Sequence, residues 1–327
     1  MSDSELTRYL RSALPSDAHR GLVESVLPTL IDSIAEISKA LRQAQHVSRA
    51  GSANAFGDDQ LNVDVLAENN IRRAVWRCPF IVTASSEEDP IERSSDTPAE
   101  NVPEEHYTIG FDPLDGSSII APNWTVGTII GIWEGKTALN QVPATKQVAA
   151  ILGVYGPRTT AIVALRVPGL DPVCLELGLG EDGLEGTELI RTAVRLAEPP
   201  FKTRYFAPAN LRAAADDAKY MGLVSHFIQH KYTLRYSGGL VPDVVHALVK
   251  GHGVYISPVT AASRAKLRRL YELYPLALIV ECAGGKAISP ADGTNILDKP
   301  LCDLNETAGL VCGTAEDVDF VRKALLA

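Results

Sequence analysis

The segment GFDPLDGSS, residues 110–118, places two aspartates, Asp112 and Asp115, on either side of a proline and a leucine. Pro113 fixes one backbone φ between them, so the separation of the two carboxylates is stiffened. The carbonyl of Leu114 adds a third oxygen to the same turn. Hard divalent cations such as Mg²⁺ prefer oxygen ligands of this kind. The spacing therefore indicates a cation site.

A glycine and two serines follow this pair directly. Gly116 allows a ligand to approach the backbone closely. Ser117 and Ser118 are expected to begin a helix, whose first N–H groups are free to bind an anion. Anion-binding amides beside a cation site are the arrangement that phosphoryl chemistry requires.

Two further acidic clusters lie in the first half of the chain, in GDDQLNVD and in SEED. Each acid taken alone has a simpler interpretation as a solvated turn residue or a helix cap, which we prefer for Asp59, Asp89 and Glu100. For the adjacent pair Glu87 and Glu88 the two interpretations are evenly balanced. Three clusters in one chain favour a metal site, and the sequence leaves open whether they converge.

The elements that must position these residues follow from hydrophobic periodicity. Apolar residues recur at helical spacing over residues 22–47, and residues 60–77 predict a second helix. Residues 48–59 are rich in Gly, Ser and Asn and predict a flexible loop. Residues 79–90 and 106–116 predict strands that end in acidic clusters, and β-rich segments follow them.

Strand and helix patterns continue to the C-terminus, and the weakest seam lies at AEPPF, residues 197–201, where two prolines precede a new segment. We predict an α/β chain of two mixed domains, residues 1–197 and 198–327. The segment GLGEDG matches the glycine spacing of a dinucleotide loop. Its acids would repel phosphate, so we interpret it as a loose turn.

Composition and charge exclude several classes of partner. Hydrophobic residues make up 46% of the 327 residues and charged residues 22%, as in ordinary soluble globular proteins. The net charge of −9 repels nucleic acid and anionic lipid, so we expect neither as a partner. No apolar run reaches the length of a membrane span, and the N-terminus lacks a secretory apolar region. We expect a cytoplasmic protein whose cysteines are reduced thiols without a redox role.

The motifs FDPLDGSS and SEED together resemble the fructose-1,6-bisphosphatase family, within the wider group of magnesium-dependent, lithium-sensitive sugar and inositol phosphatases. The resemblance covers nearly the whole chain from about Leu22 onward. It implies a layered αβαβα sandwich and a metal-dependent phosphatase. Later segments, among them NWTVGTIIGIW, KYTLRYSGGLVPDV and AKLRRLYE, resemble the sedoheptulose-1,7-bisphosphatase branch of that family.

The resemblance implies a role for each acidic residue. The residues implied to ligate the metal, by side chain or carbonyl, are Glu87, Asp112, Leu114, Asp115 and Glu272. The acids implied to orient or deprotonate an attacking water are Asp58, Asp64 and Glu88. The implied cofactor is Mg²⁺, with Mn²⁺ as the alternative.

The resemblance also implies how a sugar bisphosphate is held. The residues implied to hold the transferred phosphate and the adjoining sugar are Asp115, Gly116, Ser117 and Ser118. Those implied to hold the far phosphate and the sugar are Asn210, Arg212, Arg235, Tyr236 and Lys266. In the family the arginine at the position of Arg235 reaches in from a neighbouring subunit, which implies a homodimer or a homotetramer.

The expected reaction is hydrolysis of the 1-phosphate of sedoheptulose 1,7-bisphosphate by direct attack of activated water. Two alternatives remain open, a fructose-1,6-bisphosphatase or dual-specificity enzyme and a catalytically silent sugar-phosphate sensor. The fructose enzyme has tyrosines where this chain has Ala213 and, to within a residue, Ser257. We hypothesise that these small residues enlarge the pocket for a longer sugar.

Overall fold

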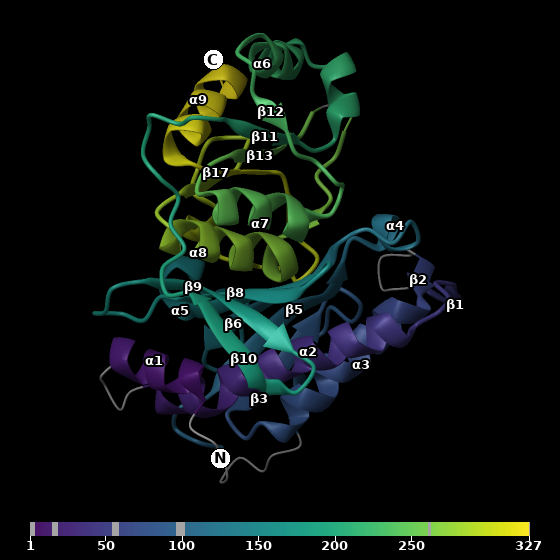
Figure 1. Ribbon diagram of the computed structural model, residues 1–327, viewed down its shortest axis with the longest axis vertical. Helices are drawn as coiled ribbons and strands as arrows, with labels where there is room; N and C mark the ends of the chain where they lie inside the picture. The colour runs from purple at the N-terminus through teal and green to yellow at the C-terminus, as the bar shows by residue number, and fades with distance from the viewer. Residues whose placement is uncertain (1–3, 15–18, 54–58, 96–101, 261–262, 327) are drawn as a thin grey trace.

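The chain folds into alternating layers of helix, sheet, helix, sheet and helix, stacked along the longest axis (Figure 1). The computed structural model describes residues 4–14, 19–53, 59–95, 102–260 and 263–326. The layered order confirms the expected αβαβα sandwich. The described part of the chain begins in the first helical layer and ends in the last one.

The first layer consists of helices from the N-terminal part of the chain. They are α1 (Glu5–Ala13), the π-helical turn η1 (Leu22–Val26), α2 (Leu27–Gln43) and α3 (Asn62–Arg77). Ser4 caps α1, because its side chain accepts a hydrogen bond from the N–H of Thr7. The periodic apolar side chains of η1 and α2, such as Leu30 and Ile34, are buried in one core with the large sheet. These two elements confirm the helix predicted over residues 22–47, which ends at Gln43.

The second layer is an eight-stranded sheet in the order β10-β9-β8-β7-β6-β5-β3-β4. In chain order its strands are β3 (Ile81–Ser86), β4 (Arg93–Ser94), β5 (Tyr107–Asp115), β6 (Val126–Glu134), β7 (Gln147–Tyr155), β8 (Thr159–Leu165), β9 (Val173–Gly180) and β10 (Gly183–Arg191). β3 and β5 run parallel, whereas the other neighbouring pairs are antiparallel. Helices cover both faces, which is why β8 reads as a continuous apolar run rather than an alternating one.

The third layer lies between the two sheets and consists of α7 (Leu240–Lys250) and α8 (Tyr274–Cys282), with the π-helical turn η4 (Arg269–Leu273) leading into α8. Two glycines allow close approach to the large sheet. A Cβ at Gly127 would lie 2.5 Å from Val241 of α7, and a Cβ at Gly110 would lie 3.0 Å from Leu270 of η4. Larger residues at these positions would push α7 and η4 away from strands β5 and β6.

The second sheet has five strands in the order β12-β11-β13-β17-β15. They are β11 (Tyr205–Pro208), β12 (Thr233–Leu234), β13 (Val254–Ser257), β15 (Lys286–Ile288) and β17 (Leu310–Gly313). Its outer face is covered by α6 (Ala218–Gln229) and α9 (Ala315–Leu326), which share a separate core with it. The remaining short elements are β1 (Arg49–Ala53), β2 (Asp59–Leu61), α4 (Ser117–Ile120), α5 (Pro143–Lys146), η3 (Leu211–Ala215), β14 (Leu267–Arg268), η5 (Ile296–Asp298) and β16 (Thr307–Ala308).

One predicted element is wrong. The flexible loop expected over residues 48–59 contains β1, which pairs antiparallel with β2. Gly and Ser lower strand propensity locally, but pairing between the two segments overrides it.

The segment GLGEDG forms the end of β9 and the tight connection to β10, so its interpretation as a turn without nucleotide-binding geometry is confirmed. Residues 192–204, which include the predicted domain seam, carry no helix or strand, and the seam itself stays a prediction.

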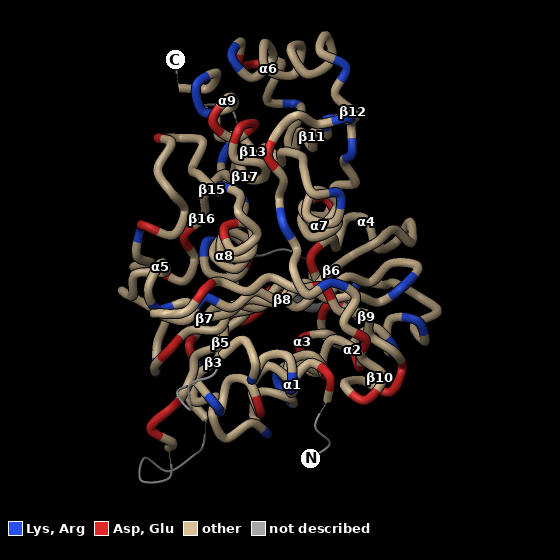
Figure 2. Tube along the Cα trace, turned by 60° about the vertical axis from the view of Figure 1, so that its left-hand side comes forward, with Lys and Arg blue, Asp and Glu red and all other residues tan. Residues whose placement is uncertain are grey.

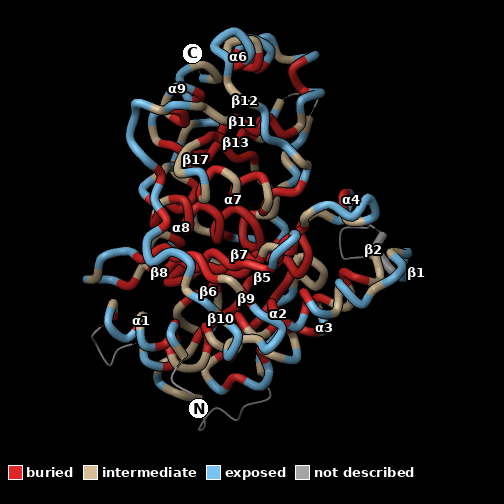
Figure 3. The backbone as a smooth tube through the Cα atoms, in the orientation of Figure 1, coloured by how far each residue is buried: buried red, intermediate tan, exposed pale blue. Residues whose placement is uncertain are grey.

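Buried residues and some acidic residues are concentrated where the central helices meet the large sheet. Buried residues run continuously from α7 and α8 into the large sheet (Figure 3). Acidic residues are not confined to the surface, because several lie between α7 and the large sheet (Figure 2). Four of the five cysteines are buried and all five are free thiols. Among the described residues, every helix is too short or too polar to cross a bilayer.

Candidate active site

Three carboxylates from distant parts of the chain converge at one edge of the large sheet. Glu87, Asp112 and Glu272 each present an oxygen within 4.8 Å of the other two. Glu87 directly follows β3 and Asp112 lies in β5. These two strands are parallel, so their carboxyl ends lie side by side. The N–H of Glu87 donates to the carbonyl of Phe111 at 3.0 Å, which fixes the start of the acidic loop against β5.

Glu272 reaches the cluster from η4, which Gly110 allows to pack closely on β5. Its carboxylate accepts a hydrogen bond from the N–H of Arg268. The Arg268 guanidinium also lies beside the cluster, with its Nε 3.6 Å from a Glu87 oxygen. This guanidinium acts on Glu87 and Glu272, and the three carboxylates still leave a local excess of negative charge among the described residues.

Burial and this excess negative charge raise the pKa values of two of the acids in the cluster. Burial raises the pKa of Asp112 well above its usual range, and the charges of Glu87, Asp115 and Glu272 raise it further. Burial and the charge of Glu87 likewise raise the pKa of Glu272, and Arg268 opposes this only in part. Buried like charges are stable only when a cation or protons neutralise them. Three carboxylates this close together, two of them buried and one half-buried, fit a divalent metal ion, which prefers such oxygen ligands.

The pH dependence of stability follows from these shifts. Burial raises the pKa of Asp115 from 3.8 to about 6, so the folded state holds a proton that the unfolded chain releases. Its contribution is present below about pH 4 and is lost as the pH rises through about 6. We expect the metal-free protein to lose roughly 3 kcal/mol over this window from this group, and Asp112 and Glu272 to extend the loss to higher pH.

Urea unfolding in EDTA at several pH values from 4 to 8 measures this loss. Saturating Mg²⁺ should largely restore the lost stability at the upper end of the range. A metal-free protein that becomes steadily more stable across the same range would contradict the prediction.

Asp115 and Leu114, which were also predicted to ligate the metal, are not among the three converging acids and make hydrogen bonds of their own. Both oxygens of Asp115 accept backbone N–H groups at the start of α7, from Leu240 at 3.1 Å and from Val241 at 2.7 Å. The Leu114 carbonyl accepts a long hydrogen bond of 3.5 Å from the Ser117 hydroxyl. The charge of Asp115 still acts on Asp112. Asp115 thus lies at the edge of the cluster and joins it to α7.

Two of the acids predicted to act on water, Asp64 and Glu88, are held by hydrogen bonds from neighbouring residues. Asp64, in the first turn of α3, accepts the N–H of Leu61 at 2.9 Å and the Ser117 hydroxyl at 3.4 Å. Glu88, next to Glu87, accepts a hydrogen bond from the Gln60 side chain. Asp58 lies outside the described residues.

The predicted anion-binding residues form a tight turn directly after β5. Gly116 adopts a φ of 103°, in the left-handed region that glycine tolerates. The short helix α4 begins at Ser117, which confirms the expectation that the serines start a helix. Ser117 and Ser118 are exposed beside the buried acids. Hydroxyl and amide donors are therefore accessible next to the carboxylate cluster.

Some of the residues predicted to hold the far phosphate come together in the C-terminal half. The pKa of the Tyr236 hydroxyl is raised by burial and by Asp243, and it is lowered by the backbone N–H of Asn210 and the charge of Arg212. These causes place Tyr236, Asn210 and Arg212 in one neighbourhood. Lys266 is exposed just before β14.

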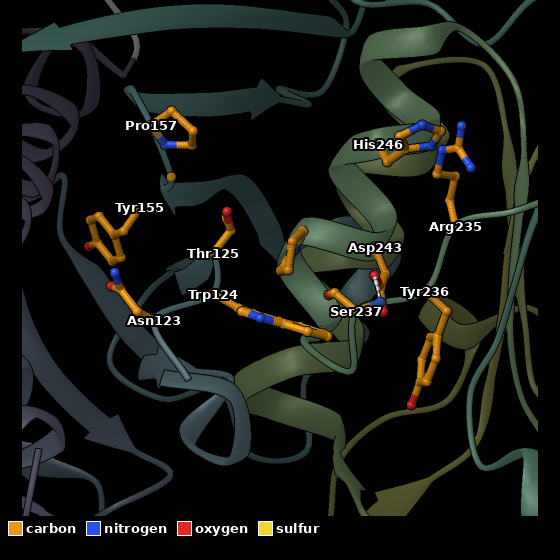
Figure 4. Close-up of a pocket in the computed structure, with 12 residues that line it drawn as sticks. Asn123, Trp124, Thr125, Tyr155, Pro157, Arg235, Tyr236, Ser237, Asp243 and His246 are labelled. Carbon is orange, nitrogen blue, oxygen red and sulfur yellow. Dashed lines mark hydrogen bonds between the residues drawn. The ribbon is translucent and has the colours of Figure 1, made fainter. Parts of the chain in front are cut away.

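Arg235 lies apart from that group. A pocket of about 710 Å³ between the large sheet and α7 is lined by Arg235, Tyr236 and His246, with Trp124 on the opposite side. Figure 4 shows Arg235 beside His246, whereas the Tyr236 ring points away from both. The Arg235 guanidinium lies 5.7 Å from the centre of the Tyr205 ring. Arg235 and Tyr236 therefore line one pocket, and their side chains point in different directions from it.

The specificity hypothesis is not supported at Ala213. Only 2% of this residue is exposed, and it is buried in the outer core with Phe206 and Tyr220. Its small size therefore serves core packing. A tyrosine introduced there would overpack the core, typically at a cost of about 1–3 kcal/mol.

Two residues of the site were not identified from the sequence, Arg268 and Asp243. Arg268 belongs to the motif AKLRRLYE, yet nothing local distinguishes it from the next arginine. Asp243 stands in the otherwise apolar stretch LVPDVV, and a carboxylate on the buried face of a predicted helix is a signal that could have been used.

Family profiles cover nearly the whole chain. One described as the N-terminal domain of fructose-1,6-bisphosphatase matches residues 8–184, and one described as its C-terminal domain matches residues 200–326. A Toxoplasma gondii structure, provisionally assigned as a sedoheptulose-1,7-bisphosphatase, is similar with a TM-score of 0.84 and 32% identity, and the match covers 98% of each chain.

Curated relatives carry two names. The chain is 38% identical over 275 residues to the chloroplastic sedoheptulose-1,7-bisphosphatase of Spinacia oleracea, which covers 83% of this chain and 66% of the plant protein. The chain thus spans just under two thirds of that relative. It is 33% identical to the class 1 fructose-1,6-bisphosphatase of Syntrophotalea carbinolica, over 97% of this chain and 92% of that protein. The chain belongs to the fructose-1,6-bisphosphatase family, whose members are generally metal-dependent.

Proposed function

We propose that this protein is a sugar bisphosphatase that removes the 1-phosphate of sedoheptulose 1,7-bisphosphate, with Mg²⁺ as its cofactor. The observation that carries the proposal is the carboxylate cluster of Glu87, Asp112 and Glu272, largely buried, beside the exposed hydroxyls of Ser117 and Ser118. Acids that need a cation and donors that suit a phosphate meet at one edge of one sheet. The higher identity to the spinach enzyme than to the bacterial one favours the seven-carbon substrate.

Each group of residues has its own role in the proposed hydrolysis. When bound, divalent cations supply positive charge to the phosphoryl oxygens and lower the pKa of water. Ser117 and Ser118 hold the transferred phosphate, and Tyr236 with Asn210 holds the far one. Water attacks phosphorus as the bond from phosphorus to the sugar oxygen breaks. Glu88 accepts the proton that the water loses, assisted by Asp64, and this proton is returned through solvent to the sugar oxygen as it leaves.

Arg235 supports an assembly of at least two subunits. It is exposed, and its side chain points away from the Tyr236 ring of its own chain, which supports a role in a neighbouring chain's far-phosphate site in a homodimer or homotetramer. We further propose that the protein acts in the cytoplasm.

Release of inorganic phosphate from both bisphosphates, with Mg²⁺ and with EDTA, tests this function. We expect release that requires Mg²⁺, one phosphate per sugar, and a higher kcat/KM for the seven-carbon substrate. A higher kcat/KM for fructose 1,6-bisphosphate would instead favour the alternative named by the bacterial relatives. Binding of both sugars without any release would indicate a catalytically silent sensor.

A further inference from the structure

The segment that joins β12 to α7, residues 235–239, carries Arg235 and Tyr236 at its start. We call it the 235–239 loop. Asp243, in the first turns of α7, lies beneath it with only 6% of its surface exposed. Its two carboxylate oxygens accept the N–H of Ser237 at 2.7 Å and the N–H of Gly238 at 3.2 Å. Figure 4 shows the bond between Asp243 and Ser237.

The end of this loop and the start of α7 are held in the same manner. The N–H of Gly239 donates to the Ser237 hydroxyl at 3.3 Å. The next two N–H groups, of Leu240 and Val241, donate to Asp115. Every backbone N–H from Ser237 to Val241 therefore has a side-chain acceptor. Buried main-chain groups that are all satisfied have little freedom to move.

This arrangement fixes the main chain directly after Tyr236. The Tyr236 ring is half exposed and points away from Arg235, and its hydroxyl faces the backbone N–H of Asn210. Because Ser237 is anchored to Asp243, the direction in which the Tyr236 side chain leaves the backbone is set before any substrate binds. Side chains and loops that are ordered in advance bind more tightly, because less entropy is lost on binding.

We propose that Asp243 is a positioning residue for substrate binding, which holds the 235–239 loop so that Tyr236 is ordered for the phosphate remote from the reacting centre. This inference rests on the proposed function. The carboxylate is specifically needed because two N–H donors require two acceptor oxygens. An asparagine would turn its own NH₂ group toward one of them.

The substitution Asp243→Asn tests the inference with two substrates. For the sugar bisphosphate we expect KM to rise about tenfold while kcat stays within about twofold. For p-nitrophenyl phosphate, which has one phosphate and cannot reach Tyr236, kcat/KM should stay within about twofold. An equal loss on both substrates, or an unchanged KM for the bisphosphate, would overturn the assignment.

The matched control is Asp317→Asn. Asp317 is also a buried carboxylate of the C-terminal half, but it accepts hydrogen bonds from Arg204 and Tyr232 rather than from the loop. It should lower the Tm without changing KM. A KM that rises equally in this control would assign the effect to lost stability and contradict the role of Asp243.

Amide hydrogen exchange gives a readout that needs no substrate. Asp243→Asn should speed exchange at Ser237 and Gly238 and leave exchange in β3 and β5 unchanged. If the wild type released phosphate from neither bisphosphate, the proposed function would fail, and exchange would still decide whether Asp243 holds the loop. Should Asp243→Asn not fold, Ser237→Ala, which removes the acceptor of the Gly239 N–H, should raise the bisphosphate KM in the same direction. An unchanged KM in that variant would refute the inference.

Discussion

Asp112→Asn should abolish most of the activity and stabilise the metal-free protein. The substitution removes one of three converging carboxylates that repel one another, while its carbonyl oxygen can still accept the N–H of Leu114. With one charge fewer for a cation to bind, we expect kcat to fall by about a thousandfold or more, since metal ions contribute several kcal/mol to such reactions. Without metal, relief of the repulsion should raise the Tm.

Three measurements check this prediction: phosphate release at saturating Mg²⁺, metal affinity by calorimetry, and thermal unfolding in EDTA. Asp292→Asn is the control, because Asp292 lies exposed on a turn remote in sequence from the cluster. It should change none of the three appreciably. A metal-free Asp112→Asn protein less stable than the wild type would show that the carboxylate is held by favourable contacts, against the prediction.

Glu88→Gln should slow the reaction by about 10²–10⁴-fold without weakening metal binding. Glu88 is not one of the three converging acids, so a neutral side chain there removes a proton acceptor and leaves the cluster intact. The amide keeps the shape of the side chain, and its NH₂ group can no longer take a proton from water.

Asp64→Asn is the companion experiment and has a different side effect. Asp64 accepts the N–H of Leu61 with one oxygen and the Ser117 hydroxyl with the other, so an asparagine, which has a single acceptor oxygen, should also cost about 1 kcal/mol of stability through one lost hydrogen bond. If both acids act on one proton transfer, the double variant should be little slower than the slower single variant. Strictly multiplied losses, or loss of metal binding in Glu88→Gln, would contradict a shared catalytic role.

Much of the fold could be predicted because its signals are local. Helical spacing along α2 and α3 reports which faces meet the sheet, and uninterrupted apolar runs mark strands covered on both sides. The hairpin of β1 and β2 could not be predicted in this way. Its residues are poor strand formers, and only the pairing of two segments gives them an extended structure.

In the active site, too, local features could be predicted and long-range contacts could not. The sequence alone determined the close, Pro113-stiffened spacing of Asp112 and Asp115 and the small residues after it, because geometry over a few residues is set by the covalent chain. The expected turn between the two aspartates is wrong, because both lie in β5, with an irregular register between them. Only the tertiary structure decided that Glu272 lies beside Asp112 and that both oxygens of Asp115 accept N–H groups of α7. It also decided that the side chains of Arg235 and Tyr236 point apart. Those outcomes depend on how η4 and α7 pack against β5 and β6, where glycines allow close contact between segments far apart in the chain.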